Sequence, residues 1–364
     1  MIAFIVGTTA ELIKMAPVFH ELTGRGRNCE IWYTAQHVEE LSGTLIDLDL
    51  PAPAEWLVPE DGAGNLAKVK DVPGWGLRLL RTVASRRRHL AQRLASDGQP
   101  PLVLVHGDTF TAPLGALIGH RLGARVGHVE AGMRSGSLRH PFPEELNRRV
   151  AGRIVDVHFA PTETEAHNLR GRRGAVVTTG ANTVVDAVKY ALARPEGPSV
   201  ELPAEFAVAT LHRFELVRQE NQYREVLEIL REHSERLPIV YFAGASERAR
   251  LSSCGLLDLF DGERFRIEDK LNYVHFLPVL ARARFVVTDS GGLQQETGHL
   301  GIPCAVHRAH TEVMAGEGER FVLTRLDAGR LRGFLDDPER YRSAGTLGTY
   351  HPSRVIADAI ETLT

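Results

Sequence analysis

The sequence predicts an α/β protein with two doubly wound parallel sheets, one in each half of the chain, facing each other across a cleft. Three observations carry this prediction. Short apolar runs, typical of strands buried on both faces, alternate with segments of helical periodicity. The alternation runs through the first half and then starts again. A chain of 364 residues is also longer than one hydrophobic core usually serves.

The first half opens with the apolar run IAFIVG at residues 2–7, which is followed by helical periodicity over residues 11–22. A strand, a turn and a helix in this order are typical of the start of a doubly wound sheet. Helices are also predicted at about 75–96 and at 111–122. The further strands predicted in this half are residues 30–35, 101–107, 125–130 and 155–161.

The second half repeats the pattern and ends in a helix at 353–363, which is expected to return to the first half. Its predicted strands are residues 175–180, 205–212, 237–244, 282–292 and 302–308. We therefore expect one domain of residues 1–170 plus 352–364 and a second of residues 171–351. Ligands of such sheets bind at the carboxyl ends of the strands. The residues that follow predicted strands are therefore the candidates for binding and catalysis.

Composition excludes several classes of protein. A net charge of −3 gives no reason to expect nucleic acid or an anionic membrane as a partner. The three cysteines are far apart and form no Cys-x-x-Cys pair, which disfavours a disulfide framework and a metal knuckle. No apolar run approaches the roughly 20 residues of a membrane helix, and the N-terminal run is too short for a signal peptide. The sequence predicts a cytoplasmic protein.

The segment DSGGLQQETGHLG at residues 289–301 follows an apolar run and contains a sharp turn at Ser290, Gly291 and Gly292. A helix that starts there would present backbone amides and its positive dipole end to a diphosphate. Glu296, one turn into the helix, is placed to accept hydrogen bonds from ribose hydroxyls. The alternative is a tight turn with an ordinary N-cap.

The first turn, GTTAELIK at residues 7–14, has a single glycine where a dinucleotide fold has Gly-x-Gly-x-x-Gly. Bound NAD is therefore disfavoured, and no cofactor or metal is predicted. From this segment alone, Glu11 is interpreted as a helix cap and Lys14 as a solvated side chain.

Other polar residues follow predicted strands. HGDTFT at 106–111 ends a predicted strand and places Asp108 at its carboxyl end, where an N-cap is the alternative to catalysis. His212 and Arg213 lie at the end of another predicted strand. The alternatives for His212 are a hydrogen-bonded loop residue and, beside Arg213, a group that meets the negative charge of a leaving phosphate. The segment HVEAGMRSGSLRHPFPEELNRR at 128–149 places three carboxylates among arginines, with glycines and prolines that a solvated helix avoids.

Together these segments resemble the non-hydrolysing UDP-N-acetylglucosamine 2-epimerases, which have a glycosyltransferase-B-like fold. The resemblance covers most of the chain in order. The segments that carry it are GTTAELIKMAPV, TAQH, HGDTFT, HVEAGMRSG, PFPEELNRR, HFAPTETEAHNL, TGANTVVDAV, LHRFE and DSGGLQQE.

The resemblance implies a UDP-sugar substrate, a homodimer, and elimination of UDP to a 2-acetamidoglycal followed by re-addition. The acid/base groups that it implies are Asp108, Glu130 and Glu144. A fourth catalytic residue that it implies is His212, which with Arg213 assists the departure of UDP. The substrate-binding residues that it implies are Lys14, Arg134, Arg213, Ser290, Gly291, Gly292 and Glu296. Arg134, Arg139, Arg148 and Arg149 are expected to hold the carboxylates, with a purely structural role favoured for the last two.

The sequence also departs from the family pattern. Thr9 and Ala10 stand where the first turn usually has Arg-Pro, and Thr311 and Glu312 lack the Arg-Pro that commonly follows them. AGASER at 243–248 replaces the His-x-Asn-Pro of members activated by their own substrate, so such activation is expected to be lost or altered. A divergent member, in antibiotic or surface-glycan synthesis, is indicated.

HVEAGMR replaces the His-Ile-x-Gly-Gly-Glu of the hydrolysing branch, which favours the non-hydrolysing reaction. The alternatives are a hydrolysing 2-epimerase, an epimerase of another UDP-N-acetylated sugar such as a diacetamido sugar, a glycosyltransferase, and an inactive nucleotide-sugar binding protein. A protein that only binds has little use for the acid/base set, which argues against the last.

Overall fold

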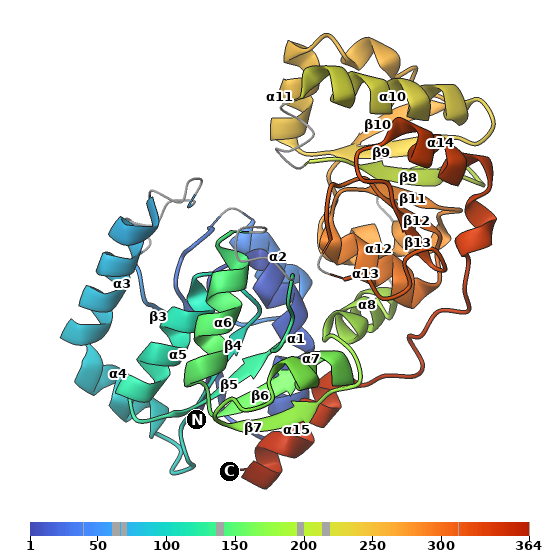
Figure 1. Cartoon of the computed structure of the whole chain (residues 1–364). Coiled ribbons are helices and arrows are strands. Elements are labelled where there is room, and N and C mark those ends of the chain that lie inside the picture. Colours follow the sequence, from blue (N-terminus) through green and yellow to red (C-terminus); the bar gives the residue numbers. More distant parts are fainter. Residues whose placement is uncertain are drawn as a thin grey trace. The chain divides into compact units, whose positions relative to one another are not determined.

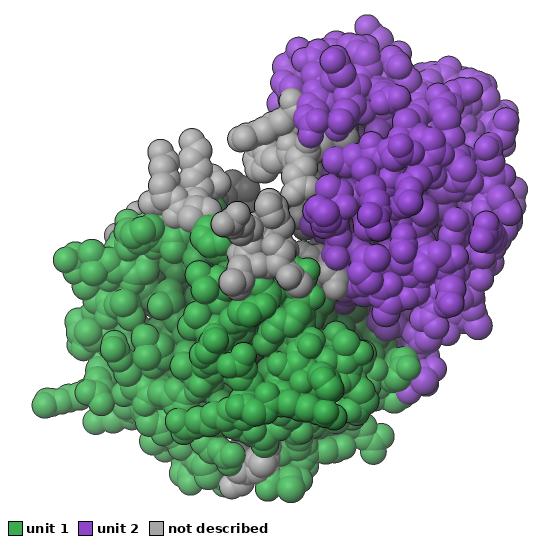
Figure 2. All heavy atoms as spheres, in the orientation of Figure 1, with its two compact units in different colours: residues 1–187, 350–364 green, residues 188–349 purple. Residues whose placement is uncertain are grey.

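The computed structural model describes residues 1–38, 40–59, 66, 71–135, 142–194, 200–212, 219–311 and 313–363. The chain forms two compact units, one of residues 1–187 with 350–364 and the other of residues 188–349 (Figure 2). The division falls inside the helix α8 (Val184–Leu192), later in the chain than residue 170.

The first unit is built, in its described residues, on seven parallel strands in the order β3-β2-β1-β4-β5-β6-β7 (Figure 1). The strands are β1 (Ile2–Val6), β2 (Cys29–Tyr33), β3 (Glu55–Trp56), β4 (Leu102–His106), β5 (Arg125–Val129), β6 (Val157–Ala160) and β7 (Ala175–Thr178). Besides α8, the helices of this unit are α1 (Thr9–Gly24), α2 (Leu41–Asp47), α3 (Val72–Ser85), α4 (Arg87–Leu94), α5 (Thr111–Arg121), α6 (Glu144–Ile154), α7 (Glu163–Asn168) and α15 (Pro352–Leu363).

The central strands of this sheet are mostly apolar because helices cover both faces. All five residues of β1 and all five of β4 are buried. The C-terminal helix α15 packs against α1, where Arg25 forms ion pairs of 2.7 Å with Asp358 and 2.9 Å with Glu361. The last helix of the chain is therefore part of the first unit.

The second unit has, among the residues described, a parallel sheet of six strands in the order β10-β9-β8-β11-β12-β13 (Figure 1). The strands are β8 (Ala207–Thr210), β9 (Ile239–Ala243), β10 (Phe265–Asp269), β11 (Val286–Thr288), β12 (Cys304–Val306) and β13 (Phe321–Leu323). The helices are α10 (Glu220–Ser234), α11 (Ala245–Ser253), α12 (Tyr273–Arg282), α13 (Gly291–Leu300) and α14 (Ala328–Asp336), with 3-10 turns at η3 (Leu257–Leu259) and η4 (Pro338–Tyr341).

The predicted architecture of two parallel α/β sheets is confirmed, but two element predictions are wrong. The strand at 175–180 was expected to begin the second sheet, whereas β7 pairs with β6, with Ala175 beside Val157. The short α7 returns the chain directly to the neighbouring position, as in a βαβ unit. The helix expected at about 75–96 is two helices that meet at Arg86, whose guanidinium pairs with the buried Glu55.

The described residues contain no helix long and apolar enough to cross a lipid bilayer.

Candidate active site

The carboxyl ends of β1, β4 and β5 carry most of the predicted acid/base residues. These strands are neighbours in the first sheet. β1 leads into Gly7, β4 ends at His106 and leads to Asp108, and β5 is followed directly by Glu130. The chain passes outward from β1 to β2 and β3 and then returns to β4 on the other side of β1. Ligands of doubly wound sheets bind at such a switch point.

Glu130 is the most constrained of these carboxylates. Its backbone has a φ of 64°, in the left-handed region that residues with a side chain rarely adopt. Its Oε2 lies 2.7 Å from Lys14 Nζ and 2.9 Å from His106 Nε2. The Lys14 amine donates a hydrogen bond, whereas the histidine contact has the distance of an ion pair without the alignment of a hydrogen bond.

The surroundings of Glu130 decide its charge. Burial alone would raise the pKa of this carboxyl group, but the contacts with the Lys14 amine and the His106 ring outweigh burial and hold the pKa well below its usual value. Glu130 is therefore an ionised carboxylate in a site largely closed to water. Lys14, which taken alone read as a solvated side chain, lies against this carboxylate with 18% of its side chain exposed.

Asp108 is held by the first half of α6. The Arg148 guanidinium pairs with Asp108 Oδ2, and Asn147 Nδ2 donates to the backbone oxygen of Asp108 at 2.9 Å. The Asp108 side chain is 29% exposed and that of Arg148 only 7%. The carboxylate is therefore accessible to solvent, while the arginine that holds it is buried. The structural pairing expected of Arg148 thus includes a candidate catalytic residue.

A buried ion cluster around Glu145 supports this arrangement. Glu145 accepts hydrogen bonds from Arg149 Nε at 2.7 Å and from the Ser135 amide at 3.1 Å. Arg148 Nη1 and Arg134 Nε lie 3.8 Å and 4.0 Å from its oxygens. Burial opposes ionisation, yet the hydrogen bonds and cations hold the pKa of Glu145 below its usual value. Glu145 therefore organises the arginines of the segment.

The two adjacent glutamates differ in their surroundings. Glu145 is fully buried in the arginine cluster, while Glu144, the predicted acid/base group, is half-buried at the first position of α6. Arg134, expected to bind substrate, donates from Nη1 to the Met133 oxygen at 2.7 Å and faces Glu145. The predicted Arg139, Arg213 and Glu312 lie outside the described residues.

The turn after β1 is tied to the turn after β4 by Glu11. Its Oε2 accepts from the amides of Gly7 at 2.8 Å and Thr8 at 2.9 Å, and its Oε1 accepts from the Thr109 hydroxyl at 2.7 Å. Thr8 and Glu11 form a capping box, so the helix-cap interpretation of Glu11 is confirmed. A Cβ at Gly7 would lie 2.3 Å from the Thr111 hydroxyl, so only glycine fits there.

In the second unit, His212 and Asp289 form a pair at the carboxyl ends of the neighbouring strands β8 and β11. His212 Nδ1 lies 3.1 Å from Asp289 Oδ1, and the His212 amide donates to Oδ2 at 2.9 Å. Asp289 is 1% exposed, whereas the histidine side chain is 48% exposed. A carboxylate beside Nδ1 favours a proton on that nitrogen, which leaves the other ring nitrogen, Nε2, as the one that can exchange a proton with a ligand.

The Ser-Gly-Gly turn follows directly. The Ser290 hydroxyl caps α13 by accepting from the Leu293 amide at 3.4 Å, and Gly291 and Gly292 form the first turn of the helix. The N-cap alternative is therefore correct for Ser290 itself. Glu296 is buried further along α13, beside Tyr273, whose pKa is raised well above its usual value by burial and then by this carboxylate.

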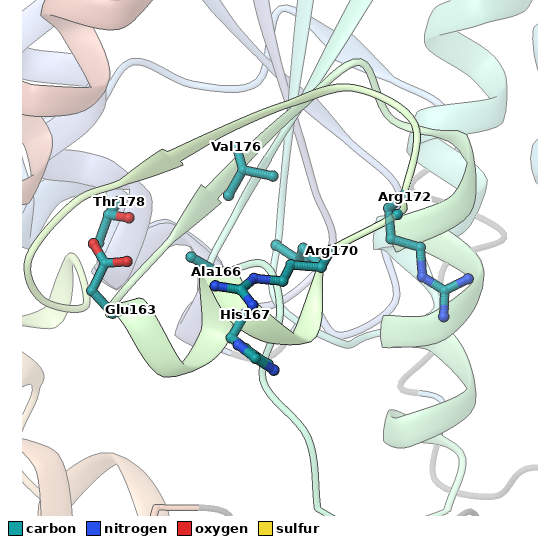
Figure 3. A pocket seen from close by; sticks show the side chains of 9 residues that line it. Glu163, Ala166, His167, Arg170, Arg172, Val176 and Thr178 are labelled. Carbon is teal, nitrogen blue, oxygen red and sulfur yellow. The ribbon is translucent and has the colours of Figure 1, made fainter.

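A surface hollow of about 490 Å³ lies between α7 and β7, with Glu163, His167, Arg170 and Arg172 around it (Figure 3). None of the predicted site residues lines it. The described residues contain no group of three or more His, Cys, Asp or Glu side chains placed to hold a metal ion.

Sequence analysis missed three residues of the site. His106 and Asp289 each lie near the carboxyl end of a predicted strand, so their position in the sequence was a usable signal. The sequence does not distinguish Glu145 from the adjacent Glu144. The two differ in burial, which no sequence pattern indicates.

The sequence profile of the family described as UDP-N-acetylglucosamine 2-epimerase matches residues 79–324. The chain is 31% identical to the UDP-N-acetylglucosamine 2-epimerase of Bacillus subtilis, over 98% of this chain and 93% of that protein.

Solved structures agree in fold and in sequence. The UDP co-structure of S. aureus MnaA has a TM-score of 0.77 and 28% identity and covers 100% of this chain and 96% of that one. The UDP-GlcNAc 2-epimerase of Methanocaldococcus jannaschii, in complex with UDP-GlcNAc and UDP, has a TM-score of 0.74 and 25% identity, with 100% and 99% covered. By its profile match and by its identity to these relatives, the chain belongs to the UDP-N-acetylglucosamine 2-epimerase family.

Proposed function

We propose that this protein is a non-hydrolysing UDP-N-acetylglucosamine 2-epimerase, which interconverts UDP-N-acetylglucosamine and UDP-N-acetylmannosamine. The observation that carries the proposal is Glu130, a buried carboxylate kept ionised by Lys14 and His106 at the switch point of the first sheet. The substrate class is supported by membership of the UDP-N-acetylglucosamine 2-epimerase family and by the similarity to the Bacillus subtilis enzyme.

The chemistry explains why several acid/base groups are needed. C2 of an N-acetylhexosamine has no neighbouring carbonyl, so its proton is too weakly acidic for direct removal at neutral pH. When the C1–O bond breaks first, its electron pair leaves with UDP, and the carbon skeleton becomes electron-poor. Loss of the C2 proton then gives the 2-acetamidoglycal. Re-addition of UDP, with a proton arriving on the other face of C2, completes the inversion.

Proton removal and return on opposite faces require more than one proton-transfer group. Glu130 is ionised and ready to accept a proton. Asp108, beside Arg148, and Glu144, at the start of α6, are the further groups of the proposal. The arginine cluster around Glu145 keeps α6 in place relative to these carboxylates.

The residues proposed to receive UDP are those of the second unit. A departing diphosphate gains negative charge, which the His212 side chain and the amides at the start of α13 stabilise. Asp289 holds His212 through Nδ1. Glu296, buried one turn along the helix, is proposed to bind ribose hydroxyls, and Arg213 to assist the leaving phosphate.

The non-hydrolysing outcome rests on the sequence HVEAGMR in place of the hydrolysing branch's motif. In this reaction the glycal stays bound until UDP returns, whereas hydrolysis would release N-acetylmannosamine. We also propose a homodimer. Cys29, Cys254 and Cys304 are free thiols, which fits a reducing cytoplasm.

The test is proton NMR of the purified protein with UDP-N-acetylglucosamine in deuterated water. We expect signals of UDP-N-acetylmannosamine to grow while deuterium enters C2 of both sugars. Accumulation of free N-acetylmannosamine with UDP would instead establish the hydrolysing reaction. The absence of both changes would contradict this substrate, and the same assay would then be run with UDP-diacetamido sugars.

A further inference from the structure

Both contacts to the Glu130 carboxylate fall on the same oxygen. Lys14 Nζ and His106 Nε2 lie 2.7 Å and 2.9 Å from Oε2. His106 is 5% exposed and Glu130 10%, so neither side chain has much freedom to turn away. The left-handed backbone of Glu130 fixes the start of the same side chain. The carboxylate is thus held at one oxygen from two sides, by residues of α1 and β4.

We infer that His106 is a positioning residue: with Lys14 it anchors Oε2 of Glu130, so that Oε1 is the oxygen that exchanges the C2 proton of the sugar. The inference rests on the proposed epimerisation and adds to it a residue that acts through Glu130. When Glu130 acts as the base, the proton moves from C2 to Oε1. The C2–H electron pair becomes the second bond between C1 and C2, and the C1–O electron pair departs with UDP.

The neighbouring strands show what a purely structural histidine looks like in this sheet. His128 on β5 and His158 on β6 are both buried. Each uses Nε2 to donate a hydrogen bond to a backbone oxygen, that of Gly107 for His128 and that of Arg173 for His158, both at 2.7 Å. Burial lowers the pKa of each ring, as expected for neutral core histidines. The Nε2 of His106 faces a carboxylate instead of a backbone oxygen.

His158 therefore provides a matched control. His106→Leu removes the contact to Glu130, while His158→Leu removes a histidine of similar burial from the same sheet without touching that carboxylate. His106→Gln tests rescue, because a glutamine amide nitrogen can occupy nearly the position of the imidazole Nε2.

Turnover of UDP-N-acetylglucosamine is the first readout. We expect His106→Leu to lower kcat by about 10- to 100-fold with KM nearly unchanged, as for a misplaced proton-transfer group. His106→Gln is expected to recover most of kcat, and His158→Leu to retain it. An equal loss of kcat in the two leucine variants, or no loss in His106→Leu, would overturn the inference.

A second readout is independent of turnover. The Glu130 side-chain carbon is followed by carbon NMR during a pH titration of labelled protein, and its signal is assigned with Glu130→Gln. Three charged or titratable groups act on Glu130: Lys14 from α1, His106 from β4 and His128 from β5. His106 lowers the pKa of the Glu130 carboxyl group, so the Glu130 titration is expected to move to higher pH in His106→Leu and to stay in place in His158→Leu.

The two proposals fail in different ways. A wild-type protein that converts no UDP-sugar would contradict the proposed function, while the titration would still decide whether His106 holds Glu130. An active wild-type protein whose Glu130 titrates alike in both leucine variants would contradict the role of His106 alone.

Discussion

Arg148 is the residue that connects catalytic candidates with structural ones. Its guanidinium pairs with Asp108 on one side and lies 3.8 Å from Glu145 on the other. Arg149 contacts Glu145 at 2.7 Å and has no described contact with Asp108. Both arginines therefore contact Glu145, and Arg148 also pairs with Asp108. This difference makes them a matched pair for mutation.

We expect Arg148→Met to lower kcat about tenfold or more, because Asp108 loses the cation that orients it. Arg149→Met is expected to lower stability but to keep kcat near that of the wild type, because Asp108 keeps its partner. Steady-state kinetics and urea unfolding of both variants provide the comparison. Equal losses of kcat would show that the arginines act only through the fold of α6.

The sequence predicts where polar residues gather but not which of them meet. Asp108, Glu130 and His212 were predictable because each follows an apolar run, and parallel strands bring their carboxyl ends to one edge of a sheet. The pairing of Glu130 with Lys14 spans 116 positions of the chain. It depends on strand order and side-chain direction, which a single sequence does not contain. The partnership of Asp289 with His212 was missed for the same reason.

At the scale of elements, α13 shows how local sequence fixes a site. Ser290 begins the helix as its N-cap, and Gly301 ends it with a φ of 76°. A Cβ at Gly301 would lie 2.2 Å from the backbone oxygen of Ser343, so a side chain is excluded by contact as well as by conformation. Gly298 lies inside the same helix, and a Cβ there would meet nothing within 4 Å.

We expect opposite effects when these two glycines are replaced. Gly301→Ala should destabilise the second unit by about 2 kcal/mol or more, from the left-handed conformation and the overlap with Ser343. Gly298→Ala should stabilise it by about 0.5–1 kcal/mol, because alanine loses less backbone entropy in a helix. Urea unfolding of the second unit measures both. Similar effects of the two changes would contradict this account of how α13 ends.

Central elements were predicted better than those at the edges of the sheets. β1, β4, β8 and β9 are fully buried and mostly apolar, and each was predicted. β3 has two residues and β10 reads FRIED, so neither shows the apolar signal of a central strand. β7 was assigned to the wrong sheet because its residues are partly exposed and its sequence does not indicate its neighbour.

At the scale of the whole molecule, the proposed reaction divides between the two units. The first carries the proton-transfer candidates around Glu130 and Asp108, and the second carries His212 and the α13 turn proposed for UDP. Thr9 stands in the first unit where the family usually has arginine. The account requires that the C1–O bond breaks in every turnover, because only then does the C2 proton become acidic.

The most direct test of this requirement is positional isotope exchange. UDP-N-acetylglucosamine is prepared with ¹⁸O in the bridge between C1 and the β-phosphate, and phosphorus NMR follows the label during epimerisation. Free UDP makes the oxygens of its terminal phosphate equivalent by rotation, so the account predicts that ¹⁸O moves to non-bridging positions in both recovered sugars. Epimerised product that keeps all of its ¹⁸O in the bridge would contradict the elimination of UDP.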